Sequence, residues 1–204
     1  MAVVTALRFG SGTVGLGMLP FFHVAGMVCI LHSALQAGHT LVLLRRFDPE
    51  SILRTIDKHK IQYASLVPPI VIALAKYPGA EKFDPSSLEL ITSGAAPLGE
   101  DVQRECSDLM RTPVVQGYGM TEASGVTHYP AKLINKNKPG SVGPCAVNVE
   151  CLVVDAATGQ ELGPHERGEL WVRGPQIMKG YLNNPCATAE SLDRDGWYHT
   201  GDIG

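Results

Sequence analysis

The chain has 204 residues, 45% of them hydrophobic and 18% charged, which is enough to bury the core of one globular domain or two small ones. The formal net charge is −3, and the sequence carries no basic stripe of the kind found in nucleic-acid-binding proteins. The longest strongly apolar stretch, residues 14–35, contains Pro20, His23, His32 and Ser33, which favours buried structure over a membrane-spanning helix. We also expect no secretory signal at the N-terminus.

Cysteine usage points to a reducing compartment. The five cysteines include no C-x-x-C pair, and their number is odd. This pattern predicts reduced thiols in a cytosol-like environment that serve mainly as core or surface side chains. They are Cys29, Cys106, Cys145, Cys151 and Cys186.

Strands and helices are expected to alternate through the first two thirds of the chain. A strand over 17–22 is predicted to end in a loop that holds His23, and the apolar stretch 26–37 predicts a buried helix closed by Gly38. Asp48-Pro49 is typical of a helix start, with the acid as N-cap and proline at the first helical position. Further strands are predicted over 40–44, 63–67, 88–92 and 114–115, and further helices over 68–76 and 99–110.

This alternation indicates an α/β fold with a mostly parallel sheet flanked by helices. Sheets of this kind bind ligands beyond the carboxyl ends of their strands. The loops 93–97 and 116–122 each follow a predicted strand. We therefore expect the two loops to share one rim of the sheet.

The sequence changes character after about residue 135. Strands are predicted over 149–155 and 168–173, and glycine, proline and turn signals recur every few residues. This pattern favours a small β-rich subdomain, which could be a distorted barrel. We therefore predict an α/β subdomain over 1–135 and a β-rich subdomain over 136–204.

The most informative segment is Gln116-Gly117-Tyr118-Gly119-Met120-Thr121-Glu122. Its glycines allow a ligand to approach the backbone, and the tyrosine ring between them can stack on a flat base. The Thr121 hydroxyl can bond a phosphate oxygen, and Glu122 offers a hard oxygen ligand for Mg²⁺. Near the C-terminus, Asp202 lies on a glycine-flanked turn and can accept both hydroxyls of a ribose. Together these residues predict an adenine-nucleotide site.

Other candidate motifs allow plainer interpretations. Residues 10–15 match G-x-G-x-x-G by letter, but the acidic residue that should follow about 20 positions later is missing, which argues against a dinucleotide-binding fold. On local sequence alone, His23 is more typical of a core histidine than of a ligand or base. The small residues of 93–97 would suit a simple tight turn equally well, and Arg45-Arg46 could be two solvated charges at a strand end.

Several motifs then occur in the order found in one enzyme superfamily. They are Ser-Gly-Ala-Ala-Pro at 93–97, Gln-Gly-Tyr-Gly-Met-Thr-Glu at 116–122, Gly-Ser-Val-Gly at 140–143, Gly-Glu-Leu at 168–170, Ile-Met-Lys-Gly-Tyr-Leu-Asn at 177–183 and Asp-Gly-Trp-Tyr-His-Thr-Gly-Asp at 195–202. With these motifs, the chain from about Leu19 to Gly204 resembles the adenylate-forming (AMP-binding) superfamily of acyl-CoA synthetases. It looks closest to the 4-coumarate–CoA ligases and their relatives, with beetle luciferases nearby.

The resemblance implies an activity and its cofactors. Such enzymes use ATP and Mg²⁺ to convert a carboxylic acid into an acyl-AMP with release of pyrophosphate. The thiol of coenzyme A then displaces AMP to give a thioester. Because two anions meet at the α-phosphate, Mg²⁺ and cationic groups have to neutralise charge during the first step.

The resemblance also implies a role for each matching residue. His23, Thr121 and Glu122 would be catalytic, with His23 at the acyl carboxylate and the thioester step, Thr121 at the nucleotide phosphate and Glu122 on Mg²⁺. Asp202 would take the ribose hydroxyls, and Arg46 would lie near the coenzyme A phosphates. The other nucleotide positions would be Gly94, Ala95, Ala96, Gln116, Gly117, Tyr118 and Gly119, and the acyl pocket would contain Ala25, Cys29, Gly117, Gly125 and Val126.

The sequence departs from this family pattern in two ways. Coumarate-specific ligases carry a tyrosine where Ala25 stands and usually a proline where Gly125 stands, so a fatty or other aryl acid is equally allowed as substrate. No Ser/Thr/Gly-rich phosphate loop precedes Leu19, and the family's small C-terminal domain with its adenylation lysine would follow Gly204. We therefore expect a fragment that is nearly inactive alone.

Two other classes of function stay compatible with these residues. The chain could be a non-catalytic nucleotide-binding remnant, although the retention of His23, Glu122 and Asp202 argues against decay. It could also derive from a luciferase-like oxygenase or a carrier-protein adenylation domain, against which Arg46 favours coenzyme A. The expected partners are a small carboxylic acid, ATP and coenzyme A, with no nucleic acid and no transmembrane segment. The expected compartment is the cytoplasm or the peroxisome.

Overall fold

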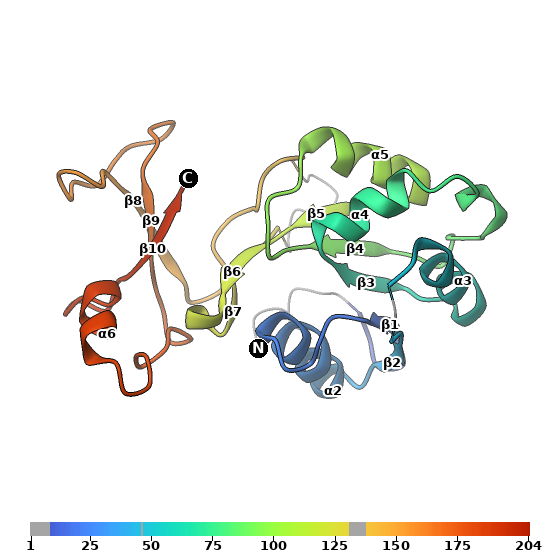
Figure 1. Cartoon of the computed structure of the whole chain (residues 1–204), viewed down its shortest axis with the longest axis horizontal. Helices are drawn as coiled ribbons and strands as arrows, with labels where there is room; N and C mark the ends of the chain where they lie inside the picture. The colour runs from blue at the N-terminus through green and yellow to red at the C-terminus, as the bar shows by residue number, and fades with distance from the viewer. Residues whose placement is uncertain (1–8, 46, 131–137) are drawn as a thin grey trace.

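A five-stranded parallel sheet forms the larger part of the molecule (Figure 1). The computed structural model describes residues 9–45, 47–130 and 138–204. The spatial order of the strands is β2-β1-β3-β4-β5, and all neighbours are parallel. The strands are β1 (Val14–Gly17), β2 (Thr40–Leu43), β3 (Tyr63–Leu66), β4 (Leu90–Ser93) and β5 (Val114–Gln116). The predicted parallel sheet is therefore confirmed.

The first strand lies earlier than the sequence suggested. We expected a strand over 17–22, but β1 ends at Gly17 and the chain then turns through 20–23. Pro20 has no backbone N–H to donate to a neighbouring strand, which fits the end of pairing here. The Pro20 carbonyl instead accepts a hydrogen bond from the His23 amide at 3.1 Å.

Helices connect the strands and cover the sheet. The π-helical segment η1 (Ala25–His32) continues into α2 (Ser33–Ala37), which Gly38 ends with a left-handed φ of 71°. Asp48 begins α3 by accepting a hydrogen bond from the Ser51 amide at 2.8 Å. The helices that follow α2 in this part are α3 (Pro49–His59), α4 (Pro68–Ala75), the 3-10 turn η2 (Ala80–Lys82) and α5 (Glu100–Met110). No helix in the described ranges is long and apolar enough to cross a membrane.

The helix predicted as buried over 26–37 is buried along one stripe only. Gly26, Ile30, Ser33 and Ala34 are buried, whereas Leu35 is 72% exposed. Gly26 permits the close approach of this segment to the preceding turn, because a Cβ there would lie 2.1 Å from the Pro20 carbonyl oxygen. The predicted helix is therefore present, but it is buried on one side only.

The main core lies between one face of the sheet and three helices. In Figure 1, α4 and α5 lie above the sheet, and η1 with α2 lies below it. Alternate strand residues, including Leu16, Leu66 and Ile91, pack against α3, α4 and α5. The helices contribute the apolar side chains Ile52, Leu53, Ile56, Ile70, Val71, Leu74, Cys106 and Met110.

The opposite face of the sheet carries a smaller aromatic cluster. Tyr63, Leu90, Val115 and Tyr129 are buried there. Gly15 in β1 makes room for the Tyr63 ring, because a Cβ at Gly15 would lie 2.3 Å from that ring. The last glycine of the G-x-G-x-x-G match therefore serves sheet packing, and the segment runs into a strand rather than a helix, as we expected when we set aside a dinucleotide-binding fold.

The C-terminal part forms a small antiparallel sheet. Its order is β10-β9-β8, with β8 (Glu150–Val154), β9 (Glu169–Arg173) and β10 (Tyr198–Ile203), and helix α6 (Pro185–Ser191) lies beside it. Figure 1 shows that the hairpin β6–β7, formed by Tyr118–Met120 and Gly125–His128, lies between this sheet and the parallel one. Within the described residues the three strands form an open sheet, not the barrel that we considered.

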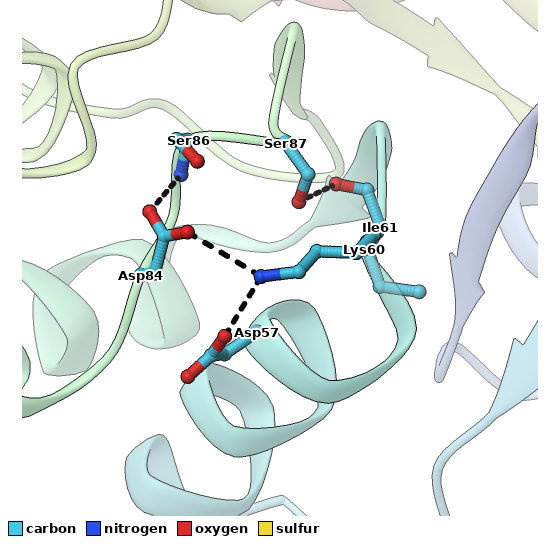
Figure 2. A network of polar contacts seen from close by, with 6 residues as sticks. All are labelled: Asp57, Lys60, Ile61, Asp84, Ser86 and Ser87. Carbon is cyan, nitrogen blue, oxygen red and sulfur yellow. Dashed lines mark hydrogen bonds and ion pairs between the residues drawn. The ribbon is translucent and has the colours of Figure 1, made fainter.

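A polar network fixes the loop that enters β4 (Figure 2). Lys60 ends α3 in a left-handed conformation, and its ammonium group binds Asp57 at 3.0 Å and Asp84 at 3.3 Å. Ser87 donates a hydrogen bond to the Ile61 carbonyl at 2.9 Å. Because both ion pairs are exposed, they orient the loop more than they stabilise the fold.

Leu74 and Leu35 offer a matched test of this core. Leu74 is fully buried in α4, whereas Leu35 is 72% exposed in α2. We expect Leu74→Ala to lower the free energy of unfolding by about 2–5 kcal/mol, because it removes apolar contacts and leaves a cavity. Leu35→Ala should change it by no more than about 0.5 kcal/mol. Urea denaturation of both variants measures the difference, and equal effects would contradict the assigned core.

Candidate functional site

A cavity of about 330 Å³ opens at the carboxyl ends of the strands. Its walls come from the turn before η1, the ends of β3 and β4, and the hairpin β6–β7. The predicted loops at 93–97 and 116–122 both contribute to it, as expected from their shared rim. The site residues predicted from sequence that line it are His23, Ala25, Cys29, Gly94, Ala95, Gly117, Tyr118, Gly119, Thr121, Glu122, Gly125 and Val126.

The hairpin that carries Tyr118 depends on glycine for its close pairing. A Cβ at Gly119 would lie 1.9 Å from the carbonyl oxygen of Gly125 on the opposite strand. Gly125 itself has a φ of 119°, and Ser124 before it adopts a left-handed conformation. The Gly-Tyr-Gly spacing therefore has a structural reason in addition to room for a ligand.

Tyr118 and Asp202 meet although they are far apart in the sequence. The Tyr118 hydroxyl donates a hydrogen bond to the Asp202 carboxylate at 2.6 Å. Burial of the ring, together with this bond, raises the pKa of Tyr118, so the phenol stays protonated as the donor. Asp202 does not line the cavity itself, but its carboxylate lies at the hydroxyl end of a ring that does.

Glu122 is held by a tyrosine from the C-terminal part. The Tyr181 hydroxyl donates to Glu122 Oε1 at 2.9 Å and lies 3.3 Å from the Tyr198 hydroxyl. The backbone is fixed as well, because the Met178 amide donates to the Glu122 carbonyl at 2.7 Å. The motif at 177–183 therefore orients the Glu122 carboxylate at the cavity. The sequence motif alone did not reveal this role of Tyr181.

His23 and Cys29 lie on the η1 side of the cavity. His23 Nδ1 accepts a hydrogen bond from the Ala25 amide at 3.1 Å, so the neutral ring carries its proton on Nε2. Burial raises the pKa of the Cys29 thiol to about 11, which keeps it neutral at physiological pH. Cys29 therefore fits an uncharged pocket wall and not a nucleophile.

Gln116 supports the site from inside the core. Its side-chain amide accepts from the Leu98 amide at 2.9 Å and donates to the Leu98 carbonyl at 3.0 Å. It also donates to Gln103 Oε1 at 2.8 Å. These bonds tie β5 to the segment after Ala96, so Gln116 shapes the 93–97 loop without lining the cavity.

Three predicted positions thus lie apart from the cavity lining, and one cannot be placed. Ala96, Gln116 and Asp202 are not among the lining residues. Arg46 lies outside the described residues. Sequence reasoning missed Ser65, Thr92, Ser93 and Tyr129, which also line the cavity. Strand alternation gave a usable signal for Ser65 and Thr92, whose polar side chains interrupt apolar strands and join by a 2.9 Å hydrogen bond.

The chain belongs to the AMP-binding enzyme family, whose family model matches residues 1–182. It is 43% identical to 4-coumarate–CoA ligase 2 of Oryza sativa subsp. japonica over 202 residues, which cover 97% of this chain and 36% of that protein. It is 42% identical to 4-coumarate–CoA ligase 1 of Arabidopsis thaliana, with the same two coverages. The resemblance seen in the sequence motifs is thereby confirmed.

Solved structures agree with this assignment. The fold matches that of ATP-bound MatB from Rhodopseudomonas palustris with a TM-score of 0.90 and 31% identity, over 100% of this chain and 40% of that one. It also matches O-succinylbenzoate coenzyme A synthetase from Bacillus subtilis, in complex with ATP and magnesium, with a TM-score of 0.83, 31% identity and coverage of 100% and 42%. The chain thus spans well under half the length of these relatives.

Gly119 provides a test of the hairpin. Gly119→Ala should lower the free energy of unfolding by about 1–3 kcal/mol or more, because the added methyl group meets a backbone oxygen that cannot rotate away. Gly10→Ala is the matched control, since a Cβ there meets nothing within 4 Å. Thermal unfolding compares the two variants, and an unchanged midpoint for Gly119→Ala would refute the close pairing.

Proposed function

We propose that this chain is part of an AMP-forming acid–thiol ligase. In the first step a carboxylate attacks the α-phosphate of ATP, pyrophosphate leaves and an acyl-AMP forms. In the second step the thiol of coenzyme A attacks the acyl carbon and AMP leaves. The single observation that carries the proposal is that Tyr118 and Glu122 line one largely apolar cavity while Asp202 accepts a hydrogen bond from the Tyr118 hydroxyl.

The nucleotide is proposed to bind along the hairpin β6–β7. The Tyr118 ring would pack on adenine, with the backbone of Gly94, Ala95 and Gly117 close by. Asp202 would accept the ribose hydroxyls with the carboxylate that already accepts from Tyr118. Thr121, exposed on the cavity wall, would contact a phosphate oxygen.

Glu122 suits the proposed Mg²⁺. Mg²⁺ is usually bound through one or two carboxylates together with substrate phosphates, and Glu122 offers a carboxylate at the cavity wall, oriented by Tyr181. When bound, the ion would neutralise charge on the phosphates. This chain's own contribution is to hold one carboxylate rigidly beside the cavity.

The acyl group is proposed to enter between η1 and the hairpin. Ala25, Cys29, Gly125 and Val126 form an uncharged wall there. His23 presents its Nε2 as a donor, which suits an acyl carboxylate oxygen. The names of the relatives favour a 4-coumarate-like acid, whereas the small side chains at Ala25 and Gly125 leave room for other aryl or fatty acids.

Charge balance suggests that the 204 residues alone react poorly. The described residues that line the cavity include Glu122 and His23, but no lysine or arginine. Transfer at a phosphate requires cationic groups at the developing charge. We therefore propose that further cations come from parts of the longer protein. We also propose that this protein acts in the cytoplasm or the peroxisome.

The role of Asp202 can be tested with a modified ligand. Asp202→Asn should weaken AMP binding by roughly 10- to 100-fold, because it removes a charged acceptor for the ribose hydroxyls. The same variant should bind 2′,3′-dideoxy-AMP as the unmodified chain does, since that ligand lacks both hydroxyls. Calorimetry measures all four affinities, with Asp195→Asn as an exposed control in the same segment. An equal loss for both ligands would exclude the ribose contact.

The activity itself is tested in the longer protein. We expect pyrophosphate exchange into ATP with at least one member of a panel of aryl and fatty acids. Glu122→Gln should slow exchange at least about 100-fold, because transition-state charge stabilisation is lost, whereas substitution of the exposed Glu105 of α5 by glutamine (Glu105→Gln) should leave the rate unchanged. The isolated chain should show little exchange. Absence of exchange with every acid in the panel would count against the proposed function, and robust exchange by the isolated chain would refute its dependence on other parts.

A further inference from the structure

Three potential metal ligands gather near the end of β7, outside the proposed nucleotide site. They are His128, Cys145 and Cys151, and their ligand atoms all lie within 4.8 Å of one another. His128 Nε2 and Cys145 Sγ lie 3.5 Å apart. None of the three lines the cavity. The proposed ligase function uses none of them.

The backbone brings these residues together in an ordered way. His128 at the end of β7 pairs with Cys145 in an isolated antiparallel bridge, which places the two residues directly opposite each other. Cys151 lies in β8, opposite Val172 of β9. The short turn between Cys145 and Cys151 therefore returns the second thiol to the first, and the ligands come from three separate pieces of backbone.

The hydrogen bonds around His128 direct its Nε2 toward Cys145. His128 is only 8% exposed, so its ring is held in place by the surrounding backbone and side chains. Its Nδ1 lies 3.1 Å from the Thr127 hydroxyl, which itself donates to the Tyr118 carbonyl at 3.3 Å. Since the Thr127 proton is engaged, its oxygen accepts from Nδ1–H. The lone pair of Nε2 then faces Cys145, and such an outer partner is typical of metal-bound histidine.

We propose that His128, Cys145 and Cys151 form a zinc site with an open fourth position. Tetrahedral Zn²⁺ with Zn–S near 2.3 Å and Zn–N near 2.0–2.1 Å places its ligand atoms about 3.6–3.8 Å apart. The His128–Cys145 separation of 3.5 Å is close to this value, and all three ligand atoms lie within 4.8 Å of one another. Two thiolates and one imidazole suit zinc better than a hard cation. Binding replaces two S–H bonds with two S–Zn bonds and releases two protons to solvent.

Partial exposure makes the site accessible. Cys145 is exposed and Cys151 is half-buried, so an ion can enter from solvent. Cys186 is exposed but lies in α6 and has no part in the cluster. Of the two exposed cysteines, only Cys145 lies near other potential metal ligands. This contrast gives an internal control within the same protein.

The first test is thiol protection by the metal alone. The 204-residue chain is prepared under reductant, freed of metal, and alkylated with and without one equivalent of Zn²⁺, and the modified peptides are counted by mass spectrometry. We expect Zn²⁺ to slow modification of Cys145 and Cys151 at least about tenfold, because metal-bound thiolate is withdrawn from reaction, and to leave Cys186 unchanged. Equal modification of Cys145 with and without Zn²⁺ would overturn the proposal.

The second test identifies the metal ligands by the absorption of bound Co²⁺. Co²⁺ added in place of Zn²⁺ should give one thiolate-to-cobalt absorption band per chain, and Zn²⁺ should displace it. Cys145→Ser, Cys151→Ser and His128→Gln should each abolish or strongly weaken the band, whereas Cys186→Ser should keep it. Thr127→Val should weaken Co²⁺ binding by roughly 10- to 100-fold through loss of the outer partner, and Thr127→Ser should restore it. If the Cys145→Ser variant and the Cys151→Ser variant each kept the full absorption band, the assignment of these two ligands would be refuted.

Discussion

The hydrogen bond from Tyr118 to Asp202 is the contact on which the arrangement of the site depends. It joins the hairpin β6–β7 to β10 of the antiparallel sheet, and a second bond from Tyr181 to Glu122 crosses the same boundary. Each bond has a charged acceptor, and bonds of this kind are short and directional. Two tyrosine hydroxyls therefore hold Tyr118, Asp202 and Glu122, the residues proposed to bind base, ribose and metal, in one arrangement.

Glycine makes the same region possible at the level of the backbone. Gly119 lets the two strands of the hairpin approach more closely than any side chain would permit, and Gly125 adopts a positive φ of 119° that disfavours other residues. Gly26 likewise permits a close approach at the turn that carries His23, on the other wall of the cavity. The cavity between these two walls has a described lining that is largely apolar. Such a pocket suits the acyl part of a substrate and strengthens each of its few polar interactions.

The hairpin has two functional faces in this interpretation. The Tyr118 ring faces the cavity, and its carbonyl accepts from Thr127, which in turn lies beside His128. The His128 ring lies 5.7 Å from that of Tyr118, measured between ring centres. The cluster of His128, Cys145 and Cys151 thus lies one hydrogen-bonded step behind the proposed adenine platform. Both proposed sites therefore share one short stretch of the hairpin.

The sequence by itself determined the local features of this protein. The cap at Asp48, the left-handed Gly38 and the alternation of apolar strands and helices follow from short-range sterics and hydrogen bonds, so they could be predicted residue by residue. Family motifs extended this to the choice of site residues. Only the tertiary structure decided which side chains meet, including Tyr181 at Glu122 and Cys151 near His128. These contacts join segments far apart in the chain, and their formation depends on sheet order and strand register, which no local pattern encodes.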